Sequence, residues 1–312
     1  MFQIVCDGGC DLSPAEAESL RVRIVPFYIV LDGRTQLREG VDITKEEYFG
    51  LLGGNKKLFP TTAQPSPQDY IDAYAPLLEG GMDIISLTIS SKLSGTLGSA
   101  SLAARLMEER FPDRKIAVVD SRSCAVGEGL VLKELAKMRD AGYSLERAAS
   151  LLQDVIRSAN LYFTLESLEY LRRGGRVGPA AALVGGILGL RPILHLADGA
   201  VEKLGSARGK KNALRLMEDG LARALRGMAD DAALCVGHIR NGREADSLKA
   251  RIELSLGTAI DSPVTEVGAT IGTHAGPGAL AVAYCRRFRS CEALRAAMPE
   301  SNARMGARAR SG

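Results

Sequence analysis

Short apolar runs with the character of β-strands alternate with helical patterns through the first half of the chain. Four runs are predicted as strands: Phe2–Cys6, Val22–Leu31, Asp83–Ile89 and Lys115–Val119. Runs that stay apolar without polar alternation are typical of strands buried on both faces, so they indicate a parallel sheet covered by helices. The alternation therefore predicts βαβ units in a mostly parallel, three-layer α/β/α arrangement.

A change in this rhythm near Asn160 predicts a second domain. Two helical patterns, Gly127–Ala141 and Leu145–Ser158, follow one another without a strand between them. The chain of 312 residues is also longer than one typical domain core. We therefore expect an α/β fold of two domains. The N-terminal α/β domain covers residues 1–159, the C-terminal mixed α/β domain covers residues 160–298, and residues 299–312 form a flexible tail.

The composition is that of an ordinary globular protein and disfavours several classes. The net charge of +3 is too small to argue for nucleic acid, and 5% aromatic residues without Trp make a base-stacking surface unlikely. The longest apolar run, Ala180–Leu190, is too short for a membrane span, and the N-terminus lacks the basic region of a signal peptide. We expect a cytoplasmic protein. The six cysteines form no Cys-x-x-Cys pair, so neither a metal site nor a structural disulfide is expected.

Four short stretches rich in hydroxyls, glycines and basic side chains form the candidate site. They are Thr61-Thr62-Ala63-Gln64-Pro65-Ser66, Ser90-Ser91-Lys92-Leu93-Ser94-Gly95-Thr96, Arg172-Arg173-Gly174-Gly175-Arg176 and Gly272-Thr273-His274-Ala275-Gly276-Pro277-Gly278. Helix-start amides, hydroxyls and an imidazole can together bind a small anionic group. None of the stretches has the spacing of a metal site or a phosphate-binding P-loop.

Each stretch also has a structural explanation. Ser94 follows a predicted strand and precedes a helical pattern, so it either presents its hydroxyl to a ligand or caps the helix. His274 falls in a turn-rich loop, where a surface or capping role is the alternative. Arg173 and Arg176 either complement a helix dipole or contact an anion and a partner. His195 and His238, in apolar strands, are expected to be structural.

In this order along the chain, the four stretches resemble the DegV family of fatty-acid-binding proteins. The resemblance extends from Ile4 to about Tyr284, and further matching pieces are Val119-Asp120-Ser121, Tyr170-Leu171-Arg172-Arg173-Gly174-Gly175-Arg176, and Pro192-Ile193-Leu194 followed by Asp198-Gly199. It implies two α/β domains with the ligand cleft between them. A long-chain fatty acid is held in this cleft, and its tail is bound by the C-terminal domain, residues 160–298. It also implies a lipid-binding carrier in fatty acid metabolism and lipid transport, with no cofactor and no catalysis of its own.

The resemblance extends to individual residues. It implies that the ligand carboxylate is bound by Thr62, Ser94, Gly95, Arg208 and His274. A fatty acid kinase subunit is the implied partner, which would convert the carboxylate to an acyl phosphate. Arg173 and Arg176 are expected to contact this partner, and transient membrane contact is left open. For the acyl tail we expect a lining of Leu183, Val184, Ile187, Leu188 and Ile193, whose alternative role is ordinary core.

The sequence departs from the family pattern in two places. Cys6-Asp7-Gly8-Gly9-Cys10-Asp11-Leu12 stands where Thr-Asp-Ser-Thr-x-Asp-Leu is usual, and Ala63 replaces a common Ser. Both changes remove hydroxyls near the expected head-group site.

Two other functions are open alternatives. An acyl hydrolase would use Ser94 as nucleophile and His274 as base, but the chain lacks a Gly-x-Ser-x-Gly elbow and an acid placed to orient the histidine. A DNA-binding regulator is suggested only by basic clusters such as Arg208-Gly209-Lys210-Lys211, without a helix-turn-helix pattern.

Overall fold

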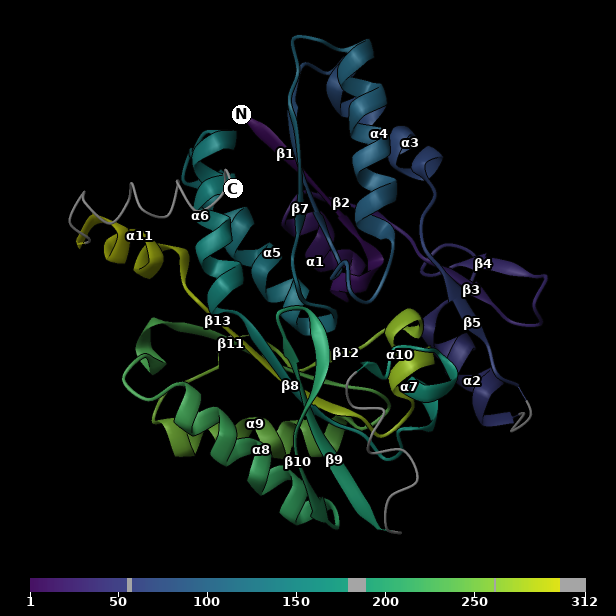
Figure 1. Cartoon of the computed structure of the whole chain (residues 1–312), viewed down its shortest axis with the longest axis vertical. Helices are drawn as coiled ribbons and strands as arrows, with labels where there is room; N and C mark the ends of the chain where they lie inside the picture. The colour runs from purple at the N-terminus through teal and green to yellow at the C-terminus, as the bar shows by residue number, and fades with distance from the viewer. Residues whose placement is uncertain (55–57, 179–188, 261, 298–312) are drawn as a thin grey trace.

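A four-stranded parallel sheet organises the first half of the chain. The computed structural model describes residues 1–54, 58–178, 189–260 and 262–297. The sheet order is β2-β1-β6-β7, formed by β1 (Phe2–Asp7), β2 (Val22–Val25), β6 (Asp83–Thr88) and β7 (Ile116–Asp120). One face is covered by α3 (Pro67–Glu79) and α4 (Thr96–Arg110), and the other by α5 (Ala125–Asp140) and α6 (Leu145–Ser158) (Figure 1). The predicted three-layer α/β/α arrangement is confirmed.

A small antiparallel sheet beside this layer was not predicted. It has the order β4-β3-β5, with β3 (Tyr28–Val30), β4 (Gln36–Arg38) and β5 (Thr61–Ala63), and α2 (Lys45–Gly54) follows β4. The prediction of a single strand over Val22–Leu31 is wrong. Pro26 separates β2 from β3, because a proline has no amide hydrogen to continue a sheet ladder.

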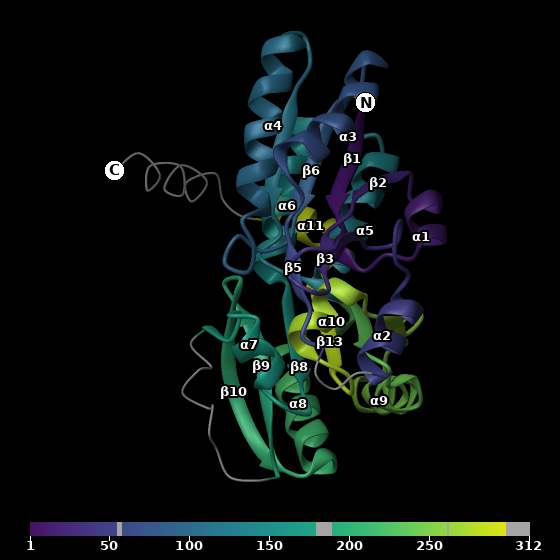
Figure 2. The ribbon, with the colours of Figure 1, turned by 90° about the vertical axis from the view of Figure 1, so that its right-hand side faces the viewer.

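The second half forms a six-stranded mixed sheet in the order β10-β9-β8-β13-β11-β12. Its strands are β8 (Asn160–Thr164), β9 (Leu190–Ala197), β10 (Ala200–Arg208), β11 (Ala232–His238), β12 (Thr265–Glu266) and β13 (Leu280–Arg286). The outer face is covered by α8 (Lys210–Ala224) and α9 (Gly242–Leu256), and the inner face is turned toward the first sheet (Figures 1 and 2). The chain enters this sheet at Asn160, where the rhythm of the sequence changes.

The last described helix does not stay with the second sheet. α11 (Phe288–Ala297) packs against α5 and α6, and the hydroxyl of Tyr143 donates to Glu292 at 2.6 Å. The backbone amide of Phe288 donates to Glu134 of α5 at 2.9 Å. The domain boundaries predicted from the sequence therefore differ from this packing, since residues 288–297 lie on the first unit.

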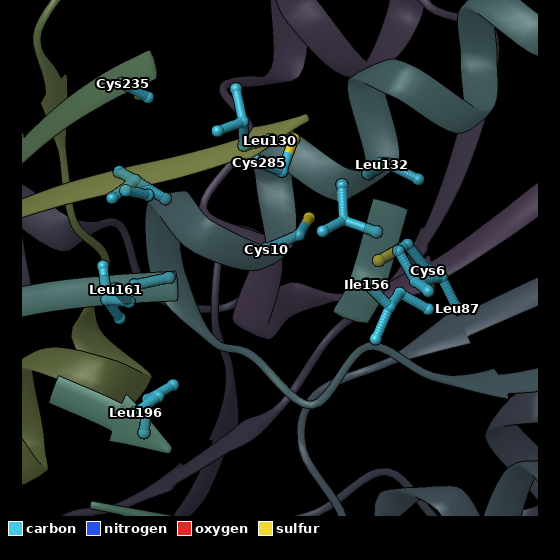
Figure 3. Packing of buried hydrophobic residues seen from close by; sticks show 14 of the residues in the cluster. Cys6, Cys10, Leu87, Leu130, Leu132, Ile156, Leu161, Leu196, Cys235 and Cys285 are labelled. Atoms are coloured by element: carbon cyan, nitrogen blue, oxygen red, sulfur yellow. The ribbon is translucent and has the colours of Figure 1, made fainter. Parts of the chain in front are cut away.

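One hydrophobic core continues through both units. It includes Cys6 and Leu87 of the first sheet, Leu130 of α5, and Leu161 and Cys285 of the second sheet (Figure 3). The helix α5 is buried on nearly all sides, because it lies between the two sheets as part of this core. None of the described helices is long and apolar enough to cross a membrane.

The tip of the β9–β10 hairpin joins the two units. Asp198 pairs with Lys92 and Arg122, and Ser90 donates its hydroxyl to the Gly199 carbonyl at 2.8 Å. Gly199 has a φ of +84°, and a Cβ there would lie 2.4 Å from the Ser90 Oγ. Glycine is therefore required both by the turn and by the close approach.

Two buried carboxyl groups, Asp7 at the end of β1 and Glu128 in the first turn of α5, lie close to each other. Asp7 accepts hydrogen bonds from the amides of Gly9 at 2.9 Å and Ile89 at 2.8 Å, whereas Glu128 accepts one from the Cys6 thiol. Glu128 Oε2 has no hydrogen-bond partner in the described part of the chain. Burial raises the pKa of Asp7 to about 7, and burial together with Asp7 raises that of Glu128 well above its usual value.

We expect Glu128→Gln to increase the free energy of unfolding at neutral pH. Below a pH of about 4.5 Glu128 is protonated in both states. As the pH rises, the unfolded chain loses this proton while the folded chain keeps it, so stability falls by up to about 1.4 kcal/mol per pH unit. Asp7 also lowers the free energy of unfolding as the pH rises from about 4 to 7, in the variant as well as in the wild type.

Denaturant unfolding between pH 5 and 8 measures this effect. The free energy of unfolding of the variant should decline less steeply over this range, because only the Asp7 contribution remains in it. Equal slopes in the variant and the wild type over the whole range from pH 5 to 8 would contradict the assignment of a retained proton to Glu128.

Candidate functional site

A largely apolar cavity of about 360 Å³ lies between the inner face of the second sheet and the first unit. This volume falls within the range of small-molecule sites. The apolar wall comes from β8 and the residues after it, the β9–β10 hairpin, β13 with the turn before it, and α10 (Ala269–Ala275), and includes Leu161, Phe163, Leu165, Leu196, Val201, Ile271, Ala275, Ala279 and Ala281. The cavity can therefore enclose a flexible apolar group.

Polar side chains from separate parts of the chain also line this cavity. Thr62 lies on β5, Ser94 in the loop between β6 and α4, and His274 on α10. Gln64 and Arg176 line the cavity as well. The structure thus brings together three of the five residues expected to bind the carboxylate.

Thr62 and His274 are in direct contact. The Thr62 Oγ1 and the His274 Nε2 are 2.8 Å apart, and either atom can donate, according to the tautomer of the ring. Burial, with a smaller contribution from Arg176, lowers the pKa of His274 to about 4, so the imidazole is neutral at pH 7. Its Nδ1 is buried without a hydrogen-bond partner among the described residues.

The Arg-Gly-Gly-Arg stretch provides the space for this imidazole. A Cβ at Gly174 would lie 2.1 Å from His274 Nδ1, so only glycine fits beside the ring. Arg176 donates from Nε to the Leu93 carbonyl at 3.1 Å and from a terminal nitrogen to the Gly174 carbonyl at 2.7 Å. It therefore connects the two units at the cavity. Arg176 was predicted as an anion and partner contact or as a cation at a helix end.

Ser94 does not cap α4, which was the alternative role predicted for it. The N-cap of α4 is Gly95, and no side chain of the described residues caps it. The Ser94 Oγ lies 2.7 Å from the Thr96 Oγ1. Gly95 is exposed and packs beside Gln64, where a Cβ would lie 2.5 Å from the Gln64 Oε1, and it does not itself line the cavity.

Arg208 lies away from the other expected carboxylate ligands. It ends β10 opposite Leu190, at the end of the hairpin far from the Asp198-Gly199 tip, and is exposed to solvent. Arg208 is not among the described residues that line the cavity. The carboxylate role of Arg208 was implied by the family resemblance. The position of Arg208 in the sequence could not show that it lies at the end of the hairpin far from the Asp198-Gly199 tip.

The expected acyl-tail residues do not account for the described cavity wall. Ile193 is buried on the opposite, outer face of the second sheet, where it packs with Leu214 and Met217 of α8. Leu183, Val184, Ile187 and Leu188 lie outside the described residues. Alternation along β8 was the missed signal, because Leu161, Phe163 and Leu165 are spaced two apart and share the inner face.

Three further predictions are corrected or refined. His274 lies in the helix α10 and not in a loop, and His238, which was taken as structural, lines the cavity. Of the departures from the family pattern, Ala63 lines the cavity. Gly9 instead packs against Asp7 and Glu128, whose oxygens would lie 2.8 and 3.2 Å from a Cβ.

The observed pairing does not favour a Ser–His hydrolase. Ser94 bonds to Thr96 and His274 bonds to Thr62, and no carboxylate among the described residues bonds to His274 Nδ1. The described residues also contain no group of three or more His, Cys, Asp or Glu side chains arranged to hold a metal ion. The arrangement is instead a set of neutral and cationic donors beside an apolar space.

Comparisons with known proteins agree with this architecture. A family model described as "Uncharacterised protein, DegV family" matches residues 1–287. A DegV domain-containing protein of Deinococcus radiodurans is 36% identical, over 90% of this chain and 96% of the relative.

Solved structures are similar over most of their length. A stearic acid-binding protein from Eubacterium ventriosum superposes with a TM-score of 0.89 at 32% identity, covering 93% of this chain and 100% of that chain. A fatty-acid-binding DegV family protein from Thermus thermophilus has a TM-score of 0.82 at 34% identity, covering 91% and 99%. The chain described here belongs to the DegV family.

Proposed function

We propose that this chain binds a long-chain fatty acid and presents its carboxylate to a partner kinase, which forms an acyl phosphate. The observation that carries the proposal is the convergence of Thr62, Ser94 and His274 on one largely apolar cavity. Two relatives share the fold: a stearic acid-binding protein at 32% identity and a fatty-acid-binding DegV family protein at 34% identity. We assign the carboxylate to Thr62, Ser94 and His274, with Arg176 as the nearby cation in place of Arg208.

Burial of the acyl chain supplies the free energy of binding in this proposal. At about 0.8 kcal/mol per methylene, a chain of about sixteen carbons gains on the order of 10 kcal/mol on leaving water. A carboxylate that enters the same space must exchange its water for charge-assisted hydrogen bonds, because an unpaired buried charge is far too costly. Hydroxyls and an imidazole at the apolar cavity supply such bonds.

The first test is whether the purified protein carries a fatty acid and loses it when a hydroxyl is removed. Mass spectrometry of an organic extract should find about one acyl chain per protein. Thr62→Val should weaken binding of added stearate by about tenfold or more, the size expected for a hydrogen bond to a charged oxygen. Thr61→Val is the matched control on the same strand, since Thr61 is exposed and outside the cavity.

Two results would reject the proposal. One is protein without stoichiometric lipid that also takes up no added stearate. The other is an equal effect of Thr61→Val and Thr62→Val on affinity, which would remove Thr62 from the carboxylate site.

The kinase contact is expected on the surface formed by α7 (Glu169–Arg173) and its neighbour Phe59. Arg173 pairs with Glu169, and its guanidinium lies 3.5 Å from the centre of the exposed Phe59 ring. Unlike Arg176, Arg173 does not line the cavity. A change at this position can therefore separate a partner contact from lipid binding.

Arg173→Glu should slow kinase-dependent phosphorylation of the bound lipid while stearate affinity stays the same. The reversed charge would oppose an acidic partner surface, an effect that acts mainly on the association rate. Phosphorylation rates with the purified kinase and stearate titrations measure the two properties. Loss of both would assign Arg173 to folding, and loss of neither would remove it from the interface.

A further inference from the structure

Two carboxylates hold the amino end of α10, and neither belongs to the second sheet. Asp11 follows the short 3-10 helix Gly8–Cys10, and Glu39 follows β4. The amide of Gly268 donates to the Asp11 Oδ1 at 2.8 Å. The amides of Ala269 and Thr270 donate to the two oxygens of Glu39, the second at 2.9 Å. Three amides that a helix cannot satisfy itself are thereby bonded to the other unit.

The geometry at this contact is close and specific. A Cβ at Gly268 would lie 2.2 Å from the Glu39 Oε1 and 3.0 Å from the Asp11 Oδ1, so only glycine admits both carboxylates. The two acids repel each other, and burial together with Glu39 raises the pKa of Asp11 well above its usual value. The hydrogen bond from the Gly268 amide and the nearby Lys45 act in the opposite direction and lower the pKa of Asp11 in part.

The same helix forms part of the cavity wall. Thr270, Ile271, His274 and Ala275 all line the cavity, and His274 lies just over one helical turn after Thr270. A helix moves as a rigid element, so a shift at its amino end is passed to the imidazole. The 2.8 Å contact between His274 and Thr62 leaves little room for such a shift.

We propose that Glu39 and Asp11 are positioning residues of the ligand site, which hold α10 so that His274 meets Thr62 at the cavity. The inference rests on the proposed function, since the site that they position is the fatty-acid site. Neither carboxylate lines the cavity itself. Their effect on a ligand therefore passes through the backbone amides of α10.

The experiment uses the full chain after lipid removal and follows the His274 imidazole by NMR. The chain has three histidines, and His274→Gln identifies the signals of this one. In the wild type the pKa of His274 should be about 4. Glu39→Ala should move it toward the ordinary value of about 6.5, because the ring is no longer held in its buried position.

Stearate affinity gives the second measurement. Glu39→Ala should bind stearate about tenfold more weakly. The reason is that a displaced His274 loses its charge-assisted hydrogen bond to the ligand carboxylate. Glu39→Gln should recover part of both properties, because its carbonyl oxygen can still accept one of the two amides. Glu46→Gln is the matched control, since it removes an equal charge from the exposed first turn of α2.

Several outcomes decide the inference. If the folded Glu39→Ala variant has the same His274 pKa as the wild type, the inference is overturned. Where that variant does not fold, Glu39→Gln and Asp11→Asn take its place, and an unchanged His274 pKa in both would overturn it equally. If the wild type binds no stearate, the proposed function fails, whereas the His274 titration still decides whether the carboxylates position the helix.

Discussion

The burial of α5 between two sheets is the constraint on which the rest of the structure depends. A helix that is apolar on only one side can cover one sheet, but this helix contributes to a core that reaches from Cys6 to Cys285. Its first residue, Ala125, is small and lines the cavity. The same packing that joins the two units thus leaves the space for a ligand.

The polar side of the cavity depends on close approaches. Gly174 leaves room for the ring of His274, and Gly268 leaves room for the two carboxylates at the other end of the same helix. A neutral imidazole in this environment follows from its burial, which lowers its pKa. Small residues are therefore as important to the site as the hydroxyls and the imidazole, because they decide where those groups can lie.

Much of the fold could be predicted from local pattern, and less of the site. Continuous apolar runs correctly predicted β1, β6 and β7. The small sheet was missed because its strands are three residues long and one of them follows Pro26. Thr62, Ser94 and His274 were identified by their motifs and do share a cavity. Arg208 and Ile193 were misplaced, since local pattern does not tell which end of a hairpin, or which face of a sheet, turns toward the ligand.

The return of α11 to the first unit has a consequence for dividing the molecule. A cut after residue 159 would leave α5 and α6 without the helix that covers them, and would leave Phe288 and Cys291 exposed on the other fragment. Each piece would then present an apolar face to water and tend to associate. Neither half is therefore expected to fold as a stable monomer by itself, and we expect the two halves to be inherited together in one gene.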